Sequence, residues 1–169
     1  SSSSAASDVY KRQHPLGVTP LRLLAHNRYG IVIDDDCREV EFSCEPEELG
    51  YVNSRGEFCA GPVAMSGTIT ARRGDSTCKM RVTMSGTTGE PRLCIDSLYI
   101  DDIREYPIEL EAEASGETYR VNPEILTWSV TGDDCCQVVE GAVKGVKSGR
   151  AMLRGSYEGT TVEFPVVVE

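Results

Sequence analysis

Apolar and polar residues alternate over short stretches along most of the chain, and Gly, Pro, Asn or Asp repeatedly interrupts the alternation. The stretches 40–44, 68–71, 79–84 and 162–168 are clear examples. A period of two residues is typical of β-strands that bury one face. Helical periodicity is hard to find, and its one candidate, 20–26, suits a single short turn or another strand equally well. The pattern predicts an all-β fold.

One stretch shows the alternation with particular clarity. Ile108, Leu110, Ala112 and Ala114 are separated by Glu109, Glu111 and Glu113. One face of this strand should therefore be buried and the other strongly acidic. Such a pattern is typical of an antiparallel strand that packs one face on a core and turns the other to water.

The order of strands and turns occurs twice. One copy runs from Phe42 to Val82 and the other from Leu126 to Val166, so in each the last position follows the first by 40 residues. Three pieces match between the copies before a terminal strand: 42–44 with 126–130, 56–60 with 141–145, and 66–71 with 148–153. Two copies of one sandwich unit explain this repeat better than one large domain.

The repeat predicts a domain organisation. We expect β domains at 30–84 and 93–169, joined by the polar, Gly-containing linker 85–92. Residues 14–29 should connect the first domain to an upstream domain missing from this fragment. Residues 1–13, SSSSAASDVYKRQ, have no periodicity and differ abruptly in composition from the chain after residue 13, which predicts a non-native or disordered leader.

The charge balance limits the classes of partner. The chain has 27 acidic and 17 basic residues, a net charge of −10, and its basic residues are scattered singly or in the pair Arg72 and Arg73. Without a basic stripe, nucleic acid and anionic membrane surfaces are not expected as partners. No run approaches the roughly 20 apolar residues that cross a bilayer, so membrane insertion is not expected. An export signal would lie outside this fragment.

The cysteines leave two interpretations open. The chain has seven, an odd number, no Cys-x-x-Cys pair and only two histidines, so a structural zinc site is not expected. Cys44, Cys59 and Cys78 are interpreted as small hydrophobic residues on strand faces, with one disulfide among the three as the alternative. Cys135 and Cys136 are expected in a loop with diverging side chains, and a redox role is their alternative.

Groups suited to catalysis are few. His14 and His26 have no nucleophile signature near them and are interpreted as ordinary loop or strand residues. Carboxylates cluster at 34–36, 45–48, 101–102 and 133–134. Each cluster falls at an expected turn, where Asp bonds to nearby backbone, so solvated turns are favoured over a calcium site or a glycosidase pair. We expect no catalytic, metal-binding or cofactor-binding residue in this fragment.

Trp128 is the only tryptophan of the chain. It shares one strand face with Leu126 and Val130, so it should anchor the core of the second domain. The alternative is an exposed ring that stacks on a sugar.

The second copy resembles a known repeat. Its run 126–130, LTWSV, is followed by GAVKGVKSGRA at 141–151. Together they resemble the bacterial Ig-like group 2 repeat, in which a Thr-Trp strand precedes a Gly-x-Val-x-Gly hairpin and a Gly-x-Ala strand. The resemblance covers roughly 121–169. The first copy lacks the Trp and has 57–60 where the hairpin should be, so its resemblance to the family rests on the order and spacing of its strands and turns. The resemblance implies two tandem Ig-like β-sandwich domains.

A wider resemblance covers most of the chain from residue 14 onward. The strings 27–34, 43–46 and 100–108 resemble the β-rich region downstream of the catalytic domain in bacterial phosphodiester glycosidase family proteins. The Asp-Gly-Gly-Gly type motif of that catalytic domain does not occur here. The resemblance implies a non-catalytic structural or spacer module of an exported protein, at the cell surface, in the periplasm or outside the cell. Its partner would be the upstream domain of the same polypeptide. The alternative is an adhesin-type module that binds a cell-surface glycan or protein.

Overall fold

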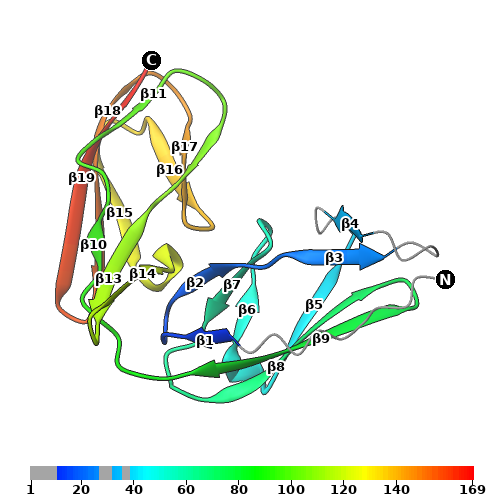
Figure 1. The fold of residues 1–169 in the computed structure, drawn as a ribbon. Helices are drawn as coiled ribbons and strands as arrows, with labels where there is room; N and C mark the ends of the chain where they lie inside the picture. The colour runs from blue at the N-terminus through cyan, green and yellow to red at the C-terminus, as the bar shows by residue number, and fades with distance from the viewer. Residues whose placement is uncertain (1–10, 27–31, 36–38) are drawn as a thin grey trace. The chain divides into compact units, whose positions relative to one another are not determined.

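The computed structural model describes residues 11–26, 32–35 and 39–169. Strands dominate these residues (Figure 1), and two one-turn 3-10 helices, η1 at Glu47–Leu49 and η2 at Pro123–Ile125, are the helical segments within them. The all-β fold predicted from the alternation is confirmed. The chain divides into two compact units, Ser1–Thr88 and Gly89–Glu169, each of which is described by itself.

The described part of the first unit contains nine strands. They are β1 Lys11–Gln13, β2 Val18–Pro20, β3 Leu23–His26, β4 Val32–Asp35, β5 Glu41–Glu45, β6 Gly50–Val52, β7 Glu57–Ala60, β8 Ser66–Arg73 and β9 Ser76–Met84. Their sheets have the orders β1-β9-β8-β5, β2-β7-β6 and β3-β4. Strand β1 runs parallel to β9, whereas the other pairs are antiparallel.

The second unit contains ten strands. They are β10 Arg92–Leu93, β11 Leu98–Ile100, β12 Glu105–Pro107, β13 Leu110–Ala114, β14 Glu117–Val121, β15 Thr127–Gly132, β16 Cys136–Val139, β17 Ala142–Gly145, β18 Gly149–Tyr157 and β19 Thr160–Val168. The sheet orders are β11-β19-β18-β15, β12-β17-β16 and β10-β13-β14. Strand β11 runs parallel to β19.

The two units repeat one pattern of strand pairing. Strand β1 lies parallel to β9, as β11 does to β19. Strand β2 pairs with β7 of the β6–β7 hairpin, as β12 pairs with β17 of the β16–β17 hairpin. Strands β3 and β4 pair with each other and β5 pairs with β8, as β13 pairs with β14 and β15 with β18. Strands β1 to β9 thus correspond to β11 to β19, and β10 is an addition. The internal repeat predicted from the sequence is confirmed, and both units are all-β sandwiches.

The N-terminal part of the first unit differs from the predicted organisation. Strands β2 and β3 lie in the segment expected to be a connector, and Val18 pairs with Cys59. Strand β1 lies in the expected leader, where Lys11 pairs with Val82. These strands have three or four residues, which is too short to show an alternation of apolar and polar residues. They form by pairing with distant segments, so the local sequence does not indicate them.

The second unit begins inside the expected linker. Strand β10 pairs with β13, so that Leu93 lies opposite Leu110. The Gly89 N–H donates a hydrogen bond of 2.7 Å to the Tyr119 hydroxyl. Residues from 89 onward therefore belong to the second sandwich, and the segment between the units is shorter than predicted.

Each unit has its own core. In the second unit Ile108, Leu110, Ala112 and Ala114 are all buried, which confirms the alternation seen in the sequence. The larger members of this core include Ile100, Val143, Leu153, Phe164 and Val166. The core of the first unit is smaller and is built around Leu49, Phe58, Ile69, Val82 and Met84. Each sandwich therefore buries apolar side chains within itself.

A polar network closes the β6–β7 hairpin of the first unit. The Asn53 side-chain oxygen accepts hydrogen bonds of 3.0 Å from the N–H groups of Arg55 and Glu57. Its amide donates to Glu57 Oε1 at 3.1 Å, and Arg55 Nε bonds the same oxygen at 3.1 Å. The buried Glu57 carboxylate is thereby paired, which removes much of the cost of burying it.

Candidate functional site

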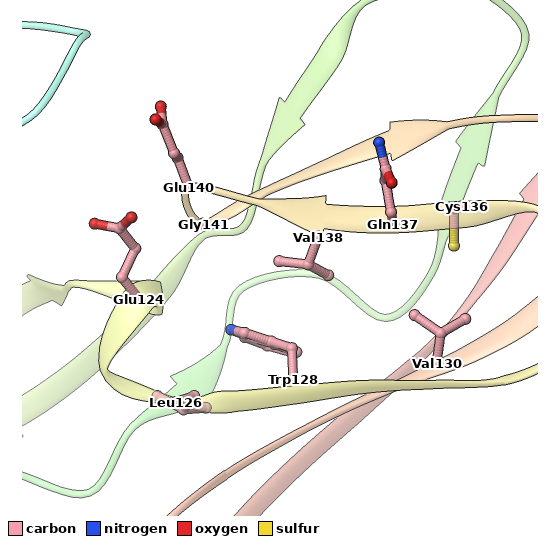
Figure 2. A pocket seen from close by; sticks show the side chains of 9 residues that line it. All are labelled: Glu124, Leu126, Trp128, Val130, Cys136, Gln137, Val138, Glu140 and Gly141. Carbon is pink, nitrogen blue, oxygen red and sulfur yellow. The ribbon is translucent and has the colours of Figure 1, made fainter.

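A groove of about 400 Å³ opens between β15 and β16 of the second unit. These two strands are the edges of separate sheets, since β15 ends the order β11-β19-β18-β15 and β16 ends the order β12-β17-β16. Figure 2 shows the lining side chains, which are Glu124, Leu126, Trp128, Val130, Cys136, Gln137, Val138, Glu140 and Gly141. Because no other described strand pairs with either edge, apolar side chains between the sheets reach solvent here.

Alternation along β15 and β16 decides which side chains enter the groove. On β15, Trp128 and Val130 are half-buried, whereas Thr127, Ser129 and Thr131 are exposed. On β16, Val138 is half-buried and points toward Trp128, whereas the exposed Gln137 leaves the strand on the opposite side from Val138 (Figure 2). The apolar side chains of Trp128, Val130 and Val138 therefore lie inside the groove, alongside polar groups that also line it.

Trp128 is held by three neighbours. Its indole N–H donates a hydrogen bond of 2.8 Å to the Pro123 carbonyl. Its ring meets Phe164 edge-to-face, with centroids 6.2 Å apart. Its cross-strand partner is Gly155, where an added Cβ would lie 2.8 Å from two ring atoms. The predicted packing of Trp128 on the core is confirmed, but the ring is only half-buried and also forms a wall of the groove.

Two turns place carboxylates at one end of the groove. Asn122 caps η2, since its side-chain oxygen accepts the Glu124 N–H at 3.0 Å. Glu140 and Gly141 form the β16–β17 turn with φ of 48° and 73°, the conformation of a type I′ hairpin that favours Gly at its second position. Both glutamates line the groove at this end (Figure 2).

The groove contains one thiol of the vicinal pair. Cys136 lies at the start of β16, and both Cys135 and Cys136 are buried in the core of the second unit. The expected loop holds for Cys135, which precedes β16, whereas Cys136 is the first residue of that strand. Burial, with a further contribution from Cys135, raises the pKa of Cys136 to about 11. The thiol stays protonated at neutral pH and is a poor nucleophile.

The other cysteines lie on strands or in a loop. Cys44, Cys59 and Cys78 lie on β5, β7 and β9 without disulfides, and Cys44 packs against the core of the first unit. Their placement agrees with the small hydrophobic interpretation. Cys94 is exposed, and Cys37 lies outside the described residues.

The histidines and the carboxylate clusters do not meet in one place. His14 lies between β1 and β2, and His26 ends β3. Asp34 and Asp35 belong to β4, so the expected turn is wrong for them because they pair with β3; Asp36 is outside the described residues. The remaining clusters lie at strand ends, in η1 or in loops. Among residues 11–26, 32–35 and 39–169, no three His, Cys, Asp or Glu side chains gather as metal ligands would.

Two loop aspartates bond to backbone as the sequence predicted. The Asp133 Oδ2 atom accepts the Arg150 N–H at 2.9 Å. The Asp102 Oδ1 atom accepts the Arg104 N–H at 3.0 Å and the Tyr106 hydroxyl at 2.9 Å. Desolvation opposes ionisation of Asp102, but the hydrogen bonds from Arg104 and Tyr106 outweigh it and lower its pKa. Both carboxylates thus stabilise loops of the second sandwich.

Comparison with known proteins finds likeness only among solved structures. No protein-family model and no curated protein matches the sequence. Domains 5–6 of the S-layer protein SbsC match at 17% identity and a TM-score of 0.36, over 99% of this chain and 96% of that chain. Human protocadherin-24 EC1-2 matches at 13% identity and a TM-score of 0.32, over 99% and 98%. The S-layer protein rSbsC(31-844) matches at 15% identity and a TM-score of 0.36, and this chain spans 22% of its length. No described helix is long and apolar enough to cross a membrane.

Proposed function

We propose that this chain is a non-catalytic spacer module of an exported bacterial protein. The observation that carries the proposal is the strand-for-strand repetition of one sandwich, β1 to β9 and then β11 to β19. Each copy has its own core, so each is built to fold as a unit and to be joined in series. Serial domains of one fold suit a protein that must hold another domain at a distance from a surface.

The domain that the spacer serves is proposed to be a phosphodiester glycosidase domain of the same polypeptide. The resemblance of 27–34, 43–46 and 100–108 to the region downstream of such domains supports this. Asp102 and Asp133 accept hydrogen bonds from backbone N–H groups in loops, which suits a structural role. The hydrolytic chemistry would then belong to the upstream domain.

Unfolding and turnover measurements test the spacer role. Trp128 lies in the second unit and is the only tryptophan, so its fluorescence follows that unit alone. Far-UV circular dichroism follows the strands of both. We expect the two signals to give different urea midpoints, and the purified chain to hydrolyse no sugar phosphodiester. Coincident transitions that shift together in variants of either core, or turnover by the chain alone, would contradict the proposal.

A second candidate function is a binding module for a glycan or a protein. The groove between β15 and β16 favours it, because a hollow at two sheet edges that combines apolar side chains with carboxylates at one end is suited to a ligand. Glycan-array or pull-down binding that variants of the groove abolish would support this function. Binding that persists in those variants would place the ligand elsewhere.

A further inference from the structure

We propose that the groove between β15 and β16 binds an extended peptide segment. The segment adds a strand to the outer edge of β15, inserts an aliphatic side chain beside Trp128, and places a basic side chain near Glu124 and Glu140. This inference rests on the second candidate function and does not depend on the spacer role.

The outer edge of β15 offers backbone groups to a partner. This strand has six residues and pairs with β18 on one side, and no described strand pairs with its other side. An edge strand presents a row of backbone N–H and C=O groups that an extended peptide can pair with. Strand β16 has only four residues, so β15 offers the longer ladder.

Three apolar side chains inside the groove offer contacts to aliphatic side chains of a peptide. Trp128 and Val130 point from β15, and Val138 from β16, into the space between the two strands (Figure 2). In an added strand every second side chain points the same way, so one or two aliphatic side chains would enter between these residues. The polar residues Thr127 and Ser129 are exposed on the other face of β15 and would be left undisturbed.

The surroundings of Trp128 favour a peptide over a sugar. A sugar ring needs a free aromatic face and polar groups that bond its hydroxyls. The indole N–H of Trp128 is already bonded to Pro123, and the ring packs against Phe164 and lies over Gly155. The indole N–H is therefore already engaged and is not offered to a sugar hydroxyl, whereas the outer edge of β15 can pair with a peptide backbone.

The charge of the groove is concentrated at one end. Glu124 and Glu140 are the charged residues among those that line the groove, and both lie at the end where β15 begins. A strand antiparallel to β15 has its C-terminal end there. A basic side chain at that end of the peptide would meet two carboxylates, which fixes the direction of the segment as well as its charge.

The probe is the peptide acetyl-SVTVTK-amide, titrated into the whole chain while the emission of Trp128 is recorded. Because Trp128 is the only tryptophan and lines the groove, a saturable change reports on this site. We expect saturation at one peptide per chain. The peptide acetyl-SVPVPK-amide lacks two backbone donors and should produce no saturable change.

Matched variants test the apolar interior and the charged end of the groove. Val138→Asp places a charge inside the groove and should weaken binding at least about tenfold. Val139→Asp is its control, because Val139 is 41% exposed and lies one position along on the outer face. Glu124→Gln with Glu140→Gln should weaken binding of the lysine peptide by about two- to fivefold and leave a norleucine analogue unaffected. Thermal unfolding of each variant verifies that it is folded.

Several outcomes would overturn the inference. They are the absence of a saturable change with acetyl-SVTVTK-amide, equal binding of the proline peptide, and equal effects of Val138→Asp and Val139→Asp. A groove that responds to cello- or chito-oligosaccharides at lower concentration than to the peptide would be a carbohydrate site instead. None of these results alters the two-transition unfolding expected of the spacer, so failures of the two proposals are distinguishable.

Discussion

Replacing Gly155 with Ala would place a methyl group against the ring that anchors the second sandwich. The new Cβ would lie 2.8 Å from Trp128 Cη2, 2.8 Å from Trp128 Cζ3 and 2.8 Å from Leu126 Cδ2. Carbon atoms pack best at about 3.5–4.0 Å, so each contact is too close by about 1 Å. Leu126 can move its methyl group, but the indole cannot retreat without losing its hydrogen bond to Pro123 and its contact with Phe164.

The expected cost of Gly155→Ala depends on these contacts. Overpacking of a core costs about 1–3 kcal/mol, and the preference of a strand for Ala over Gly returns about 0.5–1 kcal/mol. We expect Gly155→Ala to lower the free energy of unfolding of the second unit by about 1–2 kcal/mol. Ser156→Ala, at the exposed neighbouring position, should change it by less than about 0.5 kcal/mol.

A double-mutant cycle assigns the cost to the indole. Phe at position 128 lacks the outer atoms of the indole that the new methyl group meets. In a Trp128→Phe background, Gly155→Ala should therefore cost at least about 1 kcal/mol less than in the parent. Urea unfolding followed by far-UV circular dichroism measures all four proteins. Equal costs in the two backgrounds, or no cost in the parent, would refute the placement of the ring over Gly155.

Three further predictions concern other parts of the chain. Asn53→Ala removes the acceptor for two backbone N–H groups and a donor to Glu57, and should cost about 1–2 kcal/mol in urea unfolding. Asp102 has a lowered pKa, so its contribution to stability is present at neutral pH and is lost as pH falls below about 4; the melting temperatures of the parent and Asp102→Asn should converge there. Iodoacetamide at pH 8 should label the exposed Cys94 well before Cys136 in the native protein, as mass spectrometry of peptides would show; equal rates would contradict the burial of Cys136.

The sequence was most informative where a strand is long and buries one face. Strand β13 alternates Leu110, Ala112 and Ala114 with glutamates, and the repeat was visible because β8 and β18 carry similar spacing. Strands β1 and β2 have three residues each and gain their stability from distant partners. No local pattern can indicate such strands, so the first unit was predicted to begin too late.

The groove could be anticipated only in part. The strand periodicity placed Leu126, Trp128 and Val130 on one face, which is correct. These side chains reach solvent because β15 and β16 are both edge strands of their sheets. Which strand lies at an edge depends on pairing between distant segments, so the local sequence does not indicate it. Val138 and Cys136 were missed for the same reason. The Glu140-Gly141 turn was the available signal, because it marks a hairpin whose first strand must face β15.

The parallel pairing of the first and last strands has a mechanical consequence for each unit. Lys11 lies opposite Val82 and Gln13 opposite Met84, and Leu98 to Ile100 lie opposite Val166 to Val168. A chain stretched by its ends pulls such a pair in opposite directions along the strands, so the bonds between them share the load instead of opening one after another. Each sandwich would thus resist tension at the two points where the polypeptide enters and leaves it, which is where a tether is loaded.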